Sequence, residues 1–187
     1  NDNEALIEYI KPSISLVIAG AGNDIQPLVK MASVLGWKIT IGEGRVTHAT
    51  AKRFPKASQV SVVKPEQFLD NVLIDDQTYF LLMTHNYKYD LAVLKSLLQT
   101  DCHYIGILGP KSKFSRMLDD LLIEGITVNE EQLSRIHSPV GLDIGAETSE
   151  EIALSIVSEI KAVAAARIGT SLKYKSGKIH NEIHYGE

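Results

Sequence analysis

Residues that could bind or transform a ligand gather in four short segments, each directly after an apolar run. The segments are residues 20–24, 42–45, 84–88 and 109–113. Apolar runs that alternate with helical patterns indicate parallel strands, and ligands of such sheets bind beyond the carboxyl ends of the strands. We therefore expect the four segments to surround one crevice that receives an anionic ligand.

The first segment contains a glycine-rich turn between an apolar run at 14–19 and a helical pattern at 24–35. The turn consists of Gly20, Ala21, Gly22 and Asn23. Glycines at this point permit a tight turn and let backbone N–H groups approach a phosphate, as in dinucleotide-binding folds. The NAD(P) interpretation is weakened because Ile25 replaces the third glycine and the carboxylate of Asp24 repels a phosphate. A simple strand-to-helix connection is the alternative interpretation.

The second segment carries two charges. Glu43 follows Gly20 by 23 positions, near the spacing of the acid that accepts a hydrogen bond from the ribose in NAD sites. Arg45 could instead serve a 2′-phosphate. Two solvated charges in a turn are the alternative.

The third segment contains Thr84, His85 and Asn86 at the end of an apolar run. The imidazole could exchange protons, ligate a metal or hydrogen-bond a heterocycle. Asp90, at the start of the next helical pattern, could orient His85 or cap the helix. His85 and Asp90 are the candidate catalytic residues, and local backbone hydrogen bonding is the alternative role.

The fourth segment places cations at a predicted helix start. Gly109 precedes Lys111 and Lys113, and Arg116 follows one turn later. Cations are unfavourable at the positive end of a helix dipole, so an anionic ligand or an acidic partner would explain them. A solvated basic face is the alternative.

Composition excludes several other classes of protein. The net charge of −4 argues against a general nucleic-acid binder. No apolar run approaches the roughly 20 residues needed to cross a bilayer, and the N-terminal residues do not resemble a signal peptide. A single cysteine, Cys102, fits a reducing cytoplasm. His180 and His184 have i, i+4 spacing, but we predict no metal site.

The alternation of elements predicts one doubly wound parallel α/β domain, Rossmann-like, with helices on both faces of the sheet. The domain is expected over residues 1–168, including a short helical lead at 4–10, with a polar arm or disordered tail at 169–187. The strands are expected at 14–19, 38–41, 59–63, 78–83 and 103–108. The helices are expected at 24–35, 47–54, 65–72, 90–98, 111–124, within 127–136 and at 149–167.

Several strings taken together resemble one family. They are Gly20-Ala-Gly22, Arg45, Ala51-Lys-Arg-Phe-Pro55, Thr84-His-Asn86 with Asp90, and the runs 104–109, 138–145 and 149–160. Together they are similar to the C-terminal Rossmann domain of xanthine dehydrogenase accessory proteins (the XdhC/CoxI family). The resemblance covers residues 14–166.

This resemblance implies a maturation factor for molybdenum hydroxylases such as xanthine or carbon monoxide dehydrogenase. Members of the family bind molybdenum cofactor, assist exchange of an oxo for a sulfido ligand, and deliver the cofactor to the apo-enzyme. The implied partners are that apo-enzyme, a second copy of the chain, and a sulfur-donating desulfurase. The family's cysteine-bearing N-terminal domain is not in this sequence, and Cys102 does not match its cysteine.

Two functions stay open at this point, with an accessory role favoured over a turnover enzyme. In the first, the chain binds and delivers the pyranopterin cofactor, with the glycine turn, Lys111 and Lys113 facing its phosphate and with His85 and Asn86 facing the pterin. The second is an NAD(P)-dependent oxidoreductase, with His85 as acid or base and Glu43 on the ribose. A dimerisation platform with an empty pocket is a third interpretation.

Overall fold

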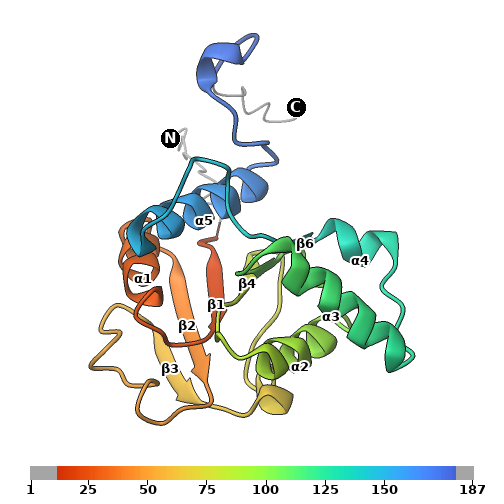
Figure 1. The fold of residues 1–187 in the computed structure, drawn as a ribbon. Coiled ribbons are helices and arrows are strands. Elements are labelled where there is room, and N and C mark those ends of the chain that lie inside the picture. The colour runs from red at the N-terminus through yellow and green to blue at the C-terminus, as the bar shows by residue number, and fades with distance from the viewer. Residues whose placement is uncertain (1–11, 180–187) are drawn as a thin grey trace, which may run out of the picture.

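The computed structural model describes residues 12–179, which contain a six-stranded parallel sheet (Figure 1). The strands are β1 (Ser15–Ala19), β2 (Lys38–Glu43), β3 (Gln59–Val62), β4 (Thr78–Leu82), β5 (Ile105–Ile107) and β6 (Ile136–His137). Their order across the sheet is β3-β2-β1-β4-β5-β6, so the direction of strand addition reverses between β1 and β4. The predicted Rossmann-like class is confirmed, and this reversal marks where the fold forms its ligand crevice.

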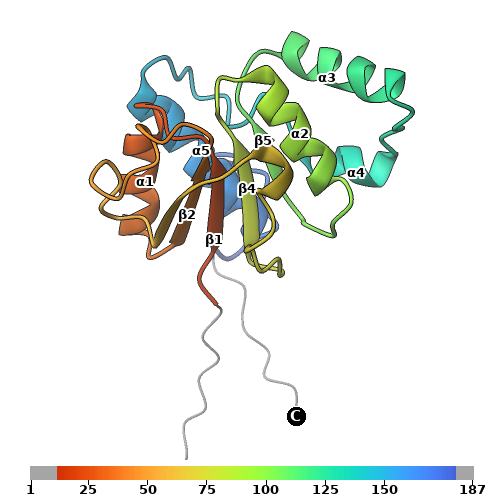
Figure 2. The ribbon, with the colours of Figure 1, turned by 90° about the horizontal axis from the view of Figure 1, so that it is seen from below.

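Helices cover both faces of the sheet. Figures 1 and 2 show α1 (Ile25–Val34) and α5 (Ser149–Ala164) on one face, and α2 (Tyr87–Leu97) and α3 (Lys111–Ile123) on the other. The five-residue helix α4 (Glu130–Ser134) precedes β6.

Strand β1 shows how the two cores arise from sequence alternation. Its Leu16 and Ile18 are buried with α1 and α5, whereas Val17 and Ala19 are buried with α2 and α3. Successive side chains of a strand point to opposite faces, so a strand covered on both sides must be apolar throughout. Burial of every residue in β4 places that strand, too, in the interior of the sheet.

Three segments differ from the sequence-based prediction. The expected helix at 47–54 is a series of turns, and at 65–72 only a single 3-10 turn, Pro65–Gln67, forms before further turns. The first segment forms no helix, but its Phe54 side chain is buried in the core. The strand β6 was not predicted, since it pairs only two residues with β5, too few for an alternating pattern.

Beyond α5 the chain extends away from the sheet (Figure 1), and residues 169–179 contain a single 3-10 turn, Leu172–Tyr174. The predicted helical lead at 4–10 and the histidines His180 and His184 lie outside the described residues. The division into a domain at 1–168 and an arm at 169–187 stays a prediction. Across residues 12–179, no helix has both the length and the apolar character required to cross a membrane.

Candidate functional site

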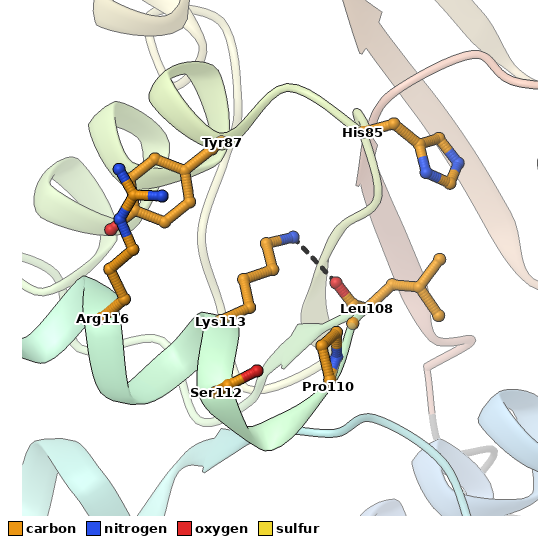
Figure 3. A pocket seen from close by; sticks show the side chains of 8 residues that line it. His85, Tyr87, Leu108, Pro110, Ser112, Lys113 and Arg116 are labelled. Carbon is orange, nitrogen blue, oxygen red and sulfur yellow. Dashed lines mark hydrogen bonds between the residues drawn. The ribbon is translucent and has the colours of Figure 1, made fainter.

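The four predicted segments follow β1, β2, β4 and β5 at the carboxyl edge of the sheet. Beside the ends of β4 and β5 lies an open cavity of about 620 Å³, here called the α3 cavity (Figure 3). It is lined by His85, Tyr87, Leu108, Gly109, Pro110, Ser112, Lys113 and Arg116. Of the four predicted segments, only 84–88 and 109–113 contribute to this lining, and no residue of 20–24 or 42–45 is among it. A single crevice surrounded by all four segments stays a prediction.

The glycine turn, residues 20–23, packs tightly against its neighbours. Gly20 has a φ of +123°, and a Cβ atom there would lie 2.5 Å from the carbonyl oxygen of Met83. Its own N–H donates to the carbonyl of Gly42 at 2.8 Å. Only glycine allows this conformation and this close approach to β4. The turn therefore requires a glycine at position 20, where β1 lies beside β4 in the sheet.

Glu43, the last residue of β2, is a buried acceptor for this turn and for its own loop. Its carboxylate accepts a hydrogen bond from the N–H of Ala21 at 3.0 Å. It also accepts from Arg45: from the backbone N–H at 3.0 Å, from Nε at 3.1 Å and from Nη2 at 2.7 Å. Burial tends to raise the pKa of Glu43, but hydrogen bonds and charge from Arg45, with the Ala21 N–H, outweigh burial and lower it. The same ion pair raises the pKa of Arg45.

The side chains of Asp24 and His85 meet across the mouth of the glycine turn. His85 Nε2 lies 2.9 Å from Asp24 Oδ2, joining segments that are 61 positions apart in the sequence. The His85 side chain is 61% exposed and that of Asp24 is 23% exposed. The backbone of His85 has a φ of 57°, the left-handed region that non-glycine residues rarely occupy. His85 therefore links the glycine turn to the α3 cavity, which it also lines.

Arg53 holds the outer side of the glycine turn and was not among the predicted site residues. Its Nη1 donates to the carbonyls of Ala21, at 2.6 Å, and His48, at 3.0 Å. Its Nη2 donates to Oδ1 of Asn23 at 2.8 Å. The string at 51–55 had marked this arginine as part of a resemblance, but no spacing rule shows which backbone atoms it reaches.

Asp90 is completely buried and pairs with Lys113, not with His85. Lys113 Nζ lies 2.7 Å from Asp90 Oδ2 and donates to the carbonyl of Leu108 at 2.8 Å. Asp90 Oδ1 accepts from the hydroxyl of Thr84 at 2.6 Å. The side chain of Asn86 caps α2 by accepting from the N–H of Tyr89. These contacts give Thr84, Asn86 and Asp90 structural roles at the end of β4.

The donors left to the α3 cavity come mainly from α3. An ammonium has three N–H groups, and two of those on Lys113 are engaged, so one remains. Arg116 is 70% exposed, and its nearest carboxylate oxygen, on Asp120, is 4.0 Å away. Figure 3 shows Lys113 between Arg116 on one side and His85 on the other. Lys111 is exposed at the first position of α3 and does not line the cavity.

Tyr87 forms an aromatic wall of the cavity that sequence reasoning missed. The guanidinium of Arg116 lies 4.4 Å from its ring centroid, and its hydroxyl donates to Asp120 at 2.6 Å. Burial and the Asp120 carboxylate raise the pKa of Tyr87 to about 12. Its position directly after His85-Asn86 was the only available signal.

Comparisons with known proteins were made with a family model, with curated proteins and with solved structures. A model described as the XdhC Rossmann domain matches residues 16–160. A Bacillus subtilis (strain 168) protein, named as a probable subunit of xanthine dehydrogenase, is 35% identical over 154 residues, covering 82% of this chain and 44% of that protein. The protein YqeB of Escherichia coli (strain K12) is 30% identical over 151 residues, covering 79% of this chain and 27% of that protein.

A solved structure gives the same result. The crystal structure of a xanthine dehydrogenase from Bacillus halodurans matches with a TM-score of 0.74 and 35% identity, covering 83% of this chain and 45% of that chain. The chain thus spans less than half the length of these relatives. With the glycine turn, the strand order and the family model in agreement, the chain belongs to the XdhC Rossmann domain family.

Proposed function

We propose that this chain is the cofactor-binding module of a maturation factor for a molybdenum hydroxylase of the xanthine dehydrogenase type. Membership of the XdhC Rossmann domain family and the name of the Bacillus subtilis relative support the target class. The observation that carries the proposal is the α3 cavity, an open volume beside the ends of β4 and β5 with N–H donors of Lys113 and Arg116 still available to a ligand.

The residues of the α3 cavity fit a phosphorylated heterocycle such as a pyranopterin. The remaining ammonium hydrogen of Lys113 and the guanidinium of Arg116 would hold the phosphate. The imidazole of His85 would hydrogen-bond the ring edge, and Leu108 with Pro110 gives an apolar wall. When bound, the molybdenum cofactor supplies the metal centre that the target enzyme needs in its sulfido form. The chain's own role is to bind, orient and release it.

The partners that accompany this role are the apo-enzyme, a second copy of the chain and a sulfur-donating desulfurase. The cytoplasm is the proposed location. The proposed role is binding and delivery and asks for no turnover chemistry from this chain. His85 contacts Asp24, and Asp90 pairs with Lys113.

The proposal is tested by purifying the chain from cells that make molybdenum cofactor and measuring the pterin released by acid. We expect the wild type to retain pterin and Arg116→Gln to retain about tenfold less, since a charged hydrogen bond is lost. Lys30→Gln is the matched control, because Lys30 is an exposed cation on α1. Equal retention by both variants, or none by the wild type, would contradict the proposal.

A further inference from the structure

We propose that Asp24 determines specificity: its carboxylate, held in place by His85, closes the glycine turn to diphosphates, so the crevice takes a ligand with a single phosphate and excludes nicotinamide dinucleotides. The exclusion follows from this chain's own contacts. Only the identity of the accepted ligand rests on the proposed function.

A dinucleotide has two requirements in a fold of this type. Its pyrophosphate lies against the glycine turn at the start of the first helix. Its ribose hydroxyl donates to an acid at the end of the second strand. Neither requirement is met by the residues at these positions.

The acid at the end of β2 has no capacity left for a ribose. A carboxylate offers about four lone-pair sites. Glu43 accepts four hydrogen bonds, one from Ala21 and three from Arg45, and its side chain is only 4% exposed. A ribose hydroxyl would have to displace one of these donors, which themselves hold the turn in place.

The space beside the second glycine is taken by a carboxylate of the chain itself. A Cβ atom on Gly22 would lie 2.2 Å from Asp24 Oδ1, so this oxygen lies against the open side of the glycine. The other oxygen, Oδ2, is held by His85. The motif uses this glycine so that the backbone can approach a pyrophosphate. Here a negative charge lies in the approach path and repels such a ligand.

Two further contacts keep the turn from opening. Arg53 ties Ala21 and Asn23 to the loop that follows β2. Ile25, the first residue of α1, is fully buried in the core, at the position where the motif has its third glycine. The glycine turn is thus held by Arg53 and by the buried Ile25, and the Asp24 carboxylate occupies the side from which a ligand would approach Gly22.

A ligand with one phosphate avoids this obstacle. The α3 cavity, at about 620 Å³, is within the size range of pockets for small ligands, and its cationic donors, Lys113 and Arg116, both lie on α3. A dinucleotide must span both sides of the switch point, whereas a phosphomonoester attached to a compact heterocycle fits on the β4–β5 side only.

The test measures binding of inorganic pyrophosphate and of NAD⁺ by titration calorimetry to the wild type and to Asp24→Ala. We expect no saturable NAD⁺ binding by the wild type at millimolar concentration. We expect Asp24→Ala to bind pyrophosphate at least about tenfold more tightly, since a like charge within a few ångströms is removed. Asp101→Asn, at an exposed position before β5 on the opposite edge of the sheet, is the control that loses the same charge.

Asp24→Asn keeps the size of the side chain and replaces the alanine variant if that variant unfolds. Saturable NAD⁺ binding by the wild type, or a pyrophosphate affinity unchanged in both variants, would overturn the inference. Pterin retention measured on the same preparations separates the two proposals. Absence of pterin from the wild type, together with a gain in pyrophosphate binding by Asp24→Ala, rejects the proposed function and leaves the specificity role of Asp24 intact.

Discussion

Each side of the crevice is formed by loops that follow parallel strands, but the two sides differ in whether their polar groups are free to bind a ligand. We call the β1–β2 side the closed side and the β4–β5 side the open side. On the β1–β2 side, Glu43 accepts from the N–H of Ala21, Arg53 donates to the Ala21 carbonyl, and the Asp24 carboxylate held by His85 lies beside Gly22. On the β4–β5 side, Arg116 and one ammonium hydrogen of Lys113 remain available beside an open volume. Strand order decides where a ligand can bind, whereas side chains at the strand ends decide which side of that place is open.

The largest loss of stability is expected when Asp90 is removed, because its buried carboxylate holds Lys113 on the open side. Asp90→Ala leaves Lys113 and the hydroxyl of Thr84 without their acceptor in a buried setting. We expect a loss of about 3–5 kcal/mol in the free energy of unfolding, measured by urea denaturation.

A double variant sharpens this prediction. Asp90→Leu with Lys113→Met removes both partners, so neither charge is left uncompensated, and the loss should be smaller than for Asp90→Ala. If the double variant is the less stable of the two, the pair is a net source of stability and this reasoning about burial is wrong.

On the closed side, the stability of the fold should depend on the backbone conformation of Gly20. Gly20→Ala forces a Cβ atom against the Met83 carbonyl at a φ of +123°, and we expect a loss of about 3 kcal/mol. Gly36→Ala is the control, because its φ of +72° is strained but no atom lies within 4 Å of the added carbon. About 1 kcal/mol is expected there. Equal losses would mean that close approach to β4 does not matter.

Because of the Glu43 carboxylate, the free energy of unfolding should fall at acid pH. Because the folded-state pKa of Glu43 is lowered, its contribution to stability is present above the unfolded value of 4.5 and is lost as pH falls through the folded value. The stability gap between the wild type and Glu43→Gln should shrink below pH 4.5, by about 1.4 kcal/mol per unit of pKa difference. Urea denaturation across that range measures it, and a constant gap would contradict the assignment.

The smallest effect on stability is expected at the front of the glycine turn. Asp24→Asn alters a partly exposed contact with His85, which is worth about 1 kcal/mol or less. A thermal or urea unfolding curve close to that of the wild type is therefore expected. A loss as large as that of Gly20→Ala would show that the pair holds the turn together and is more than a barrier to ligands.

Local sequence patterns predicted the strands, the glycine turn and the helices that surround this crevice. The apolar run, the glycines and the helical pattern indicated β1, the turn and α1, because each depends on neighbours in the sequence. The sequence also predicts that the charge of Asp24 is unfavourable for a phosphate, and this stays a prediction. Its partner was not foreseen, since His85 is 61 positions away.

The remaining misses have the same origin. Asp90 pairs with Lys113 on another element, and Arg53 reaches a turn 32 positions earlier. Tyr87 lines the cavity without any motif to mark it. Such contacts depend on how helices and loops pack over the sheet, which spacing along the chain does not encode.

The most direct test compares both sides of the crevice in one experiment. Backbone amide shifts of the isotopically labelled chain are followed by NMR during titration with inorganic phosphate. We expect saturable shifts at Ser112 and Lys113, with Gly22 and Asn23 unmoved. Shifts confined to Gly22 and Asn23 would place the anion on the closed side and contradict the proposed division of the crevice.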